Sequence, residues 1–125
     1  MNNFGTTKNN IYSLGYYLQP YGLLGDVAPG ERIFSARYVD RRLYLVTFRQ
    51  VDPFFVISFA NHRRPKILGQ LKVPGFSRYL HPYDEETVIG LGRQADSNGR
   101  QQGLKISLFD VSDCTSPKEL AKMEV

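Results

Sequence analysis

Two segments of this chain, 52 residues apart, carry the same residue pattern. Residues 65–73 align with residues 117–125 so that the proline, the lysine after it, one leucine and the final valine coincide. At the same offset, residues 56–59 align with residues 108–111. A repeat of this length indicates that one supersecondary unit occurs twice, because a single unit cannot bury its apolar faces alone.

The upstream part of the repeat aligns at a different offset. Residues 43–46 align with residues 87–90 at an offset of 44, which predicts an insertion in the second copy around residues 94–102. The inserted residues are polar, which is typical of a hairpin loop. Residues 24–27 resemble residues 68–71 and so indicate the end of a third copy.

Short apolar runs, separated by Gly, Pro, Asp and Asn, occupy most of the chain. Helical spacing of apolar residues is absent apart from a weak pattern near residues 118–125. Many short strands with turn residues between them predict an all-β protein. The predicted strands are residues 11–14, 21–24, 33–39, 43–48, 54–59, 67–73, 78–80, 87–91, 104–111 and 119–125.

Each copy therefore holds about four strands in roughly 40–50 residues, which is typical of a β-propeller blade. We expect one partial β-propeller domain over residues 1–125. It would comprise the end of a preceding blade at about residues 10–30, then two full four-stranded blades at residues 31–75 and 76–125. A β-sandwich is the alternative architecture.

Composition narrows the function classes. The chain has 125 residues, which suits one domain, and a net charge of +4 without a run of five like charges, which disfavours nucleic acid as a partner. The single cysteine, Cys114, excludes an internal disulfide and a multi-thiolate metal site. We expect no metal, no cofactor and no membrane insertion, and the N-terminus lacks signal-peptide features.

Residues 30–38, 44–57, 80–84 and 103–113 resemble the β-propeller domain in the C-terminal part of large secreted or surface-anchored prokaryotic proteins, which is distantly similar to WD40 repeats. The resemblance extends over about residues 10–125. It implies an extracellular or cell-surface location and no established catalytic residues. The family usually has Asp-Leu-Ser-Asp-Pro after the third strand. Residues 58–62 depart from that motif and Cys114 replaces its proline, so we expect weaker turn hydrogen bonds.

Ring closure requires about four to eight blades, more than this chain supplies. Three explanations remain open: a piece of a longer protein, which we favour, a ring made by several chains, and an open stack. In every case this chain by itself leaves two blade faces uncovered, which predicts self-association.

The polar residues of two segments are candidates for a site. Ser77, His81 and Asp84 are of the residue types found in a hydrolase triad, although we favour a structural role for them. Asp96 and Asn98 could offer oxygen ligands to calcium, but a turn explains the same residues.

Other candidates are weaker. Residues 90–93 are rich in glycine without a following helix, so close packing is favoured over phosphate binding. Core or interface packing is favoured over base stacking for the N-terminal tyrosines, which are Tyr12, Tyr16, Tyr17 and Tyr21.

The sequence thus predicts a non-catalytic propeller scaffold or binding module, from a larger secreted or surface protein or from a self-assembling piece. A protein or small-molecule ligand would bind at the axial face. The residues expected there are Arg37, Arg49, His81 and Asp84. The alternative is a hydrolase-like enzyme or enzyme-accessory propeller with its site at the same face.

Overall fold

The computed structural model describes residues 8–48, 52–73, 75–96, 98 and 100–125. These residues form ten strands and no helix, so the all-β prediction is confirmed. The strands are β1 (Ile11–Leu14), β2 (Pro20–Leu24), β3 (Arg32–Val39), β4 (Arg42–Phe48), β5 (Asp52–Ser58), β6 (Lys66–Val73), β7 (Phe76–Pro82), β8 (Thr87–Ala95), β9 (Gln101–Asp110) and β10 (Lys118–Glu124).

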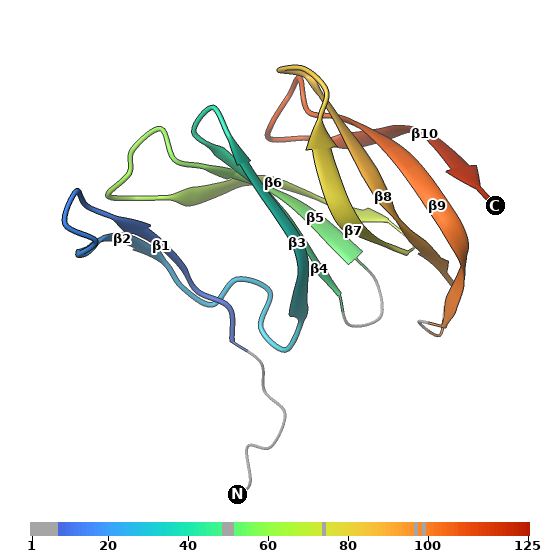
Figure 1. Ribbon diagram of the computed structural model, residues 1–125, viewed down its shortest axis with the longest axis horizontal. Helices are drawn as coiled ribbons and strands as arrows, with labels where there is room; N and C mark the ends of the chain where they lie inside the picture. The colour runs from blue at the N-terminus through green and yellow to red at the C-terminus, as the bar shows by residue number, and fades with distance from the viewer. Residues whose placement is uncertain (1–7, 49–51, 74, 97, 99) are drawn as a thin grey trace, which may run out of the picture.

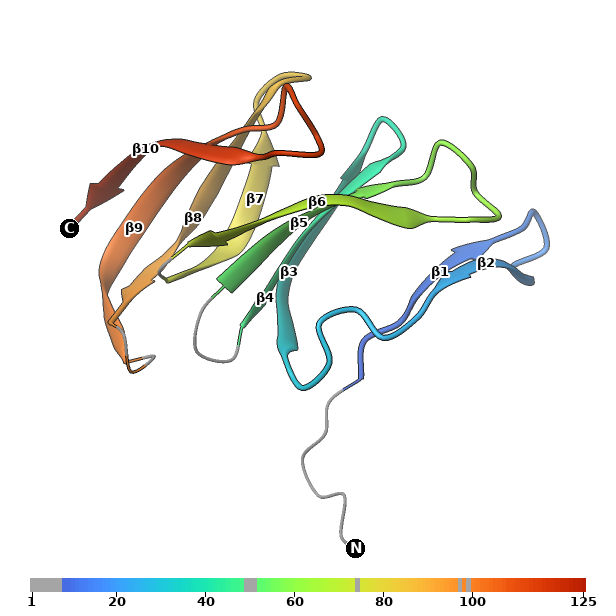
Figure 2. The same cartoon turned by 180° about the vertical axis from the view of Figure 1, so that it is seen from behind.

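The strands form two antiparallel four-stranded sheets and one two-stranded hairpin. The first sheet has the order β3-β4-β5-β6, the second has β7-β8-β9-β10, and β1 pairs with β2. Figures 1 and 2 show the hairpin and the two sheets side by side in chain order. Each sheet is a simple meander, as in a propeller blade, and strands do not cross between sheets as they do in Greek-key sandwiches.

All ten predicted strands are present, and the predicted insertion lies where β8 and β9 extend into a long hairpin that pairs Ala95 with Gln101. The upstream alignment was wrong by one residue. Ser58 pairs with Arg42 and Asp110 pairs with Thr87. Ser58 and Asp110 are 52 residues apart, so Arg42 corresponds to Thr87 at an offset of 45 rather than 44. The corrected alignment determines which residues of the two sheets occupy the same face, because a shift of one residue turns each side chain to the opposite face of its sheet.

The main core lies between the two sheets and centres on stacked aromatic rings. Phe54 of β5 stacks on Phe109 of β9, with ring centroids 4.5 Å apart and planes at 9°. Tyr44 of β4 stacks on Phe54 at 6.0 Å. The buried residues around them are aliphatic: Val46, Val56, Val73, Leu80, Val88 and Val111.

A second core lies on the other face of the first sheet. Leu45, Phe55 and Ile57 alternate with the residues of the main core and pack against Val27 and the hairpin residues Ile11 and Leu24. The hairpin supplies only two strands, and the β3 residues Ile33 and Tyr38 stay exposed.

Truncating Phe109 should therefore open a cavity in the main core. We expect Phe109→Ala to lower the free energy of unfolding by about 3–5 kcal/mol, the range for buried aromatic residues. Leu104→Ala, on the same strand at a side chain that is 58% exposed, should change it by less than about 1 kcal/mol. Urea unfolding followed by circular dichroism measures both, and equal losses would contradict this placement of the core.

Candidate functional site

One face of the second sheet repeats a face that is buried in the first. In the first sheet, Tyr44, Val46, Phe54 and Val56 are covered by the second sheet. At the corrected offsets their counterparts are Ile89, Leu91, Ile106 and Leu108. The β6 residues Leu68, Leu71 and Val73, which pack on the same core, correspond to Leu120, Met123 and Val125. Each apolar residue is matched by an apolar residue.

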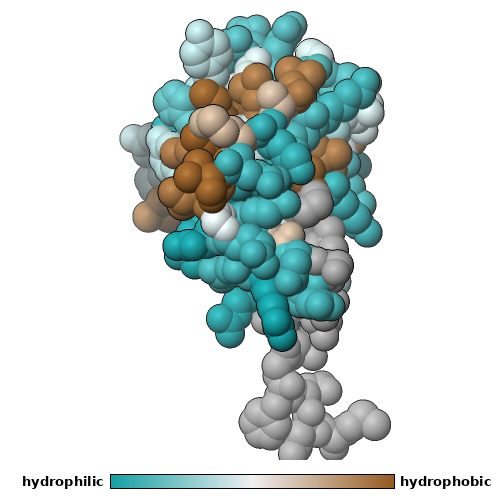
Figure 3. Space-filling model, turned by 90° about the vertical axis from the view of Figure 1, so that its right-hand side faces the viewer, coloured by the Kyte–Doolittle hydropathy of each residue, from teal (hydrophilic) through white to brown (hydrophobic). Residues whose placement is uncertain are grey.

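We call this side of the second sheet the open face. Its exposed apolar residues are Tyr79, Leu91, Leu104, Leu120, Met123 and Val125. Figure 3 views the molecule from the side where the second sheet lies and shows apolar residues gathered there. An apolar strip of this kind on a sheet face is typical of an interaction surface.

The outer strands of the hairpin and the first sheet each carry a glycine against a turn of the next sheet. A Cβ on Gly69 would lie 2.8 Å from the Thr115 carbonyl carbon, in the β9–β10 turn. A Cβ on Gly22 would lie 2.9 Å from the Arg63 carbonyl carbon, in the β5–β6 turn. The two glycines occupy equivalent positions, because Gly22 pairs with Ser13 as Gly69 pairs with Val56.

The hairpin strands β1 and β2 therefore correspond to β5 and β6 of the first sheet, and the division of the chain into a partial blade and two full blades stays a prediction. This equivalence also corrects the alignment of residues 24–27 with residues 68–71, because Gly22 corresponds to Gly69 at an offset of 47. Ser13, the partner of Gly22 in the hairpin, also contacts this turn, because its hydroxyl donates a hydrogen bond to the His62 carbonyl.

The two turns that face these glycines are built alike. Asp113 accepts hydrogen bonds from the Thr115 backbone at 3.0 Å and from its hydroxyl at 2.6 Å. Asn61 accepts a hydrogen bond from the Arg63 backbone at 3.1 Å in the same position of the other turn. Asn61 replaces Asp113 as acceptor, with one bond of 3.1 Å where Asp113 accepts two, and the expected weakening of the turn bonds stays a prediction. The bonds to Thr115 lower the pKa of Asp113, so its carboxylate form is favoured.

The glycine at the interface can be tested directly. Gly69→Ala should lower the free energy of unfolding by roughly 1–3 kcal/mol, because backbone rather than a flexible side chain meets the new methyl group. Gly25→Ala is the matched control, since its Cβ would meet only the Asn10 side chain, at 3.6 Å. Thermal unfolding of both variants measures the difference, and a neutral Gly69→Ala would show that the sheets are not this close.

A groove of about 460 Å³ separates the two sheets at their β3–β4 and β7–β8 turns. Its lining residues are Val39, Asp40, Arg42, Tyr44, Pro82, Tyr83, Asp84 and Glu85. Arg42 crosses it, because its Nη1 donates to the Glu85 carbonyl at 3.1 Å. The hydrogen bond with the Tyr44 hydroxyl is the main cause of the raised pKa of Arg42. The guanidinium thus stays charged and ties the two sheets together.

Removing this tie should loosen the two sheets. We expect Arg42→Ala to lower the free energy of unfolding by about 1 kcal/mol, the usual contribution of one hydrogen bond. Arg64→Ala, at an exposed turn position, should have little effect. Urea midpoints at matched ionic strength make the comparison, and equal midpoints for Arg42→Ala and the parent chain would contradict a stabilising role.

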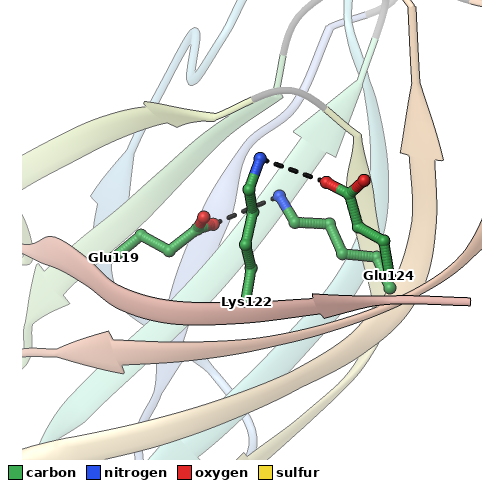
Figure 4. A network of polar contacts seen from close by, with 4 residues as sticks. Glu119, Lys122 and Glu124 are labelled. Carbon is green, nitrogen blue, oxygen red and sulfur yellow. Dashed lines mark hydrogen bonds and ion pairs between the residues drawn. The ribbon is translucent and has the colours of Figure 1, made fainter.

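Charged residues border the same inter-sheet core at the outer strands of the second sheet. Lys105 on β9 lies 3.2 Å from the carboxylate of Glu119 on β10, and the Lys105 side chain is buried. Lys122 and Glu124 form a second pair at 3.1 Å (Figure 4). The register places all four on the face that carries Phe109, so a polar rim borders an apolar interior, as at protein interfaces.

The residues predicted for a ligand site lie on different elements of the two sheets. Arg37 and His81 occupy equivalent positions on the first strands of the two sheets, opposite Tyr44 and Ile89, and both are exposed. Asp84 lies in the groove at the β7–β8 turn. Arg49 lies outside the described residues. A ligand at the axial face stays a prediction.

The hydrolase geometry is not supported by the placement of Ser77 and His81. Ser77 pairs with Gly92 and is buried between the sheets, whereas His81 pairs with Ile89. A bulge separates the two pairs and leaves the side chains on opposite faces of the sheet. His81 instead stacks on Tyr79, with centroids 6.3 Å apart.

The loop and glycine candidates have structural partners. Asp96 Oδ1 accepts hydrogen bonds from the backbones of Asn98 and Arg100, both at 2.9 Å, so it holds its own hairpin; Ser97 and Gly99 lie outside the described residues. A Cβ on Gly90 would meet the Phe109 ring at 2.9 Å, which supports the packing role. Among the described residues there is no group of His, Cys, Asp and Glu suited to a metal ion.

The remaining predictions concern Tyr21, Cys114 and membrane insertion. Arg63 lies over the Tyr21 ring and its Nε donates to the Tyr21 hydroxyl at 2.8 Å, which makes Tyr21 an interface residue. The Cys114 thiol donates to the Val111 carbonyl. No helix in the described part of the chain could span a membrane.

Sequence reasoning missed the residues that fit one sheet to the next. Gly69 and Ala121 lay opposite each other in the aligned repeat, and this difference between glycine and alanine was the available signal. Its meaning depends on a turn that is distant in sequence.

Comparisons with known proteins agree with this architecture. The chain is 46% identical over 112 residues to an uncharacterized protein of Archaeoglobus fulgidus, covering 90% of this chain and 17% of the relative. It is 44% identical over 117 residues to the uncharacterized protein MJ1554 of Methanocaldococcus jannaschii, covering 94% of this chain and 18% of the relative. The chain thus spans less than a fifth of the length of these curated relatives. The search of solved structures gave no match.

Neither relative's description gives a location, so secretion and a cell-surface position stay predictions. The family model described as "Beta propeller domain" matches residues 2–125, nearly the whole chain. On this match and on the blade-like sheets, the chain belongs to the β-propeller domain family.

Proposed function

We propose that this chain is a non-catalytic assembly and binding module that acts by stacking its uncovered sheet faces on other β-sheets. One observation carries the proposal: the open face repeats in apolar residues the face that the first sheet buries against the second. Covering a face of this composition lowers the free energy by about 25 cal/mol per Å² of buried apolar area.

The chemistry of the faces favours β-sheet partners over nucleic acid. The open face offers aliphatic side chains such as Leu104, Leu120 and Met123, whereas the charged pairs of β9 and β10 lie on the opposite face. Association through it should depend little on salt, since apolar burial is not screened. Binding to phosphates would instead weaken steeply with salt.

The test is the solution mass of this chain, by light scattering after size exclusion, over a concentration series at low and high salt. We expect masses above the 14.3 kDa of one chain, with the association retained at high salt. Leu120→Asp, on the open face, should shift the mass to that of one chain, because it places a charge in the apolar contact.

Tyr83→Asp is the matched control, since Tyr83 is exposed, lies beyond the end of β7 and lines the groove between the two sheets, and it should associate like the parent. A mass of one chain at every concentration would contradict self-association. Association that is abolished by salt would contradict the apolar mechanism.

A further inference from the structure

The open face differs from the two covered faces at one position. Ala121 pairs with Leu108 as Gly69 pairs with Val56, and both pairs adjoin a bulge in the ladder. Ala121 is therefore the counterpart of the glycines that lie against the turns of the next sheet. Its Cβ occupies the space into which those turns reach at Gly22 and Gly69.

A sheet docked in the same pose with the same turn would collide with this methyl group. The turns that face Gly22 and Gly69 are residues 59–65 and 111–117, seven residues each. Their backbones would come within 2.9 Å of a Cβ at either glycine, which real Cβ atoms essentially never do. The open face thus disfavours a partner whose corresponding turn has this length.

One turn of this chain is shorter. The hairpin turn between β1 and β2 comprises residues 15–19, five residues, closed by a Gly15 amide to Gln19 carbonyl bond of 2.8 Å. Eight residues lie between Ser13 and Gly22, whereas twelve lie between the equivalent pairs Val56–Gly69 and Leu108–Ala121, so this connection reaches less far beyond the equivalent positions. It therefore leaves room for the methyl group of Ala121.

The hairpin also carries an apolar face of its own. Ile11 and Leu24 pack on the first sheet, so the next pair along the ladder, Tyr12 and Leu23, points the other way. Tyr12, Leu23 and nearby Leu14 are each 55% exposed. We call this the hairpin face. It lies on outer strands, as do the most exposed residues of the open face on β9 and β10.

We propose that the open face binds the hairpin face of a second copy of this chain, head to tail, with the residue 15–19 turn seated over Ala121. The proposal rests on the proposed function and names its partner and its pose. A head-to-tail contact uses two different surfaces, so it extends into a stack or closes into a ring instead of stopping at a symmetric dimer.

Two blocking variants test the pairing. Met123→Arg obstructs the open face and Leu23→Arg obstructs the hairpin face, and both positions are more than half exposed, so the fold should persist by circular dichroism and urea unfolding. Each variant alone should have the mass of one chain. Their equimolar mixture should form a 1:1 complex of twice that mass, because each supplies the surface that the other lacks.

The outcomes separate this proposal from the proposed function. If Leu23→Arg alone associates like the parent, or if the mixture forms no complex while the parent associates, head-to-tail pairing is overturned and sheet stacking stands. If the parent itself has the mass of one chain at every concentration, both are overturned.

A second pair of variants tests whether the turn of residues 15–19 lies over Ala121. Inserting four glycines between Tyr16 and Tyr17 matches the length of the two longer connections and should weaken parent self-association by roughly tenfold or more, since the lengthened turn meets the Ala121 methyl group. Adding Ala121→Gly to the lengthened chain should restore it. Lack of restoration, with the insertion still weakening association, would overturn the role of Ala121.

Discussion

Face-to-face stacking of two sheets is the constraint on which this structure depends. A four-stranded sheet with apolar residues on both faces has no stable state on its own, and here each face that is covered is covered by a neighbouring sheet. The stack of Tyr44, Phe54 and Phe109 supplies the centre of the contact, with the rings of Phe54 and Phe109 nearly parallel. Because aromatic pairs prefer particular stacking geometries, these rings favour one relative position of the two sheets.

The outer strands show how close that position is. At Gly22 and Gly69 the backbone of a neighbouring turn occupies the space of a side chain, so the sheets are joined by direct backbone approach as well as by packing. The same position of the sheets sets the groove between the β3–β4 and β7–β8 turns, where Arg42 reaches the Glu85 carbonyl. Interface, groove and open face are thus consequences of one stacking geometry.

Local sequence patterns were sufficient to locate the strands, but they did not determine which face of each sheet a side chain occupies. Alternating apolar residues and turn residues located all ten strands, because both signals lie within a few residues of each other. The alignment of β4 with β8 failed by one residue, since Leu43, Tyr44, Leu45 and Val46 are all apolar and either phase fits them. Only the hydrogen-bonded partners fixed the phase. The same limit applied to Ser77 and His81, which a bulge places on opposite faces.

The sequence by itself determined that this chain forms repeated antiparallel strands of a β-propeller type, because strand propensity, turn chemistry and the 52-residue repeat are written in consecutive residues. The tertiary structure decided which face of each sheet is covered, and that Gly22 and Gly69 accept a turn where Ala121 carries a methyl group. The reason is physical: a glycine that admits a backbone from about 40 to 46 residues away has no local signature, since the atoms that require it are brought close only when the sheets stack.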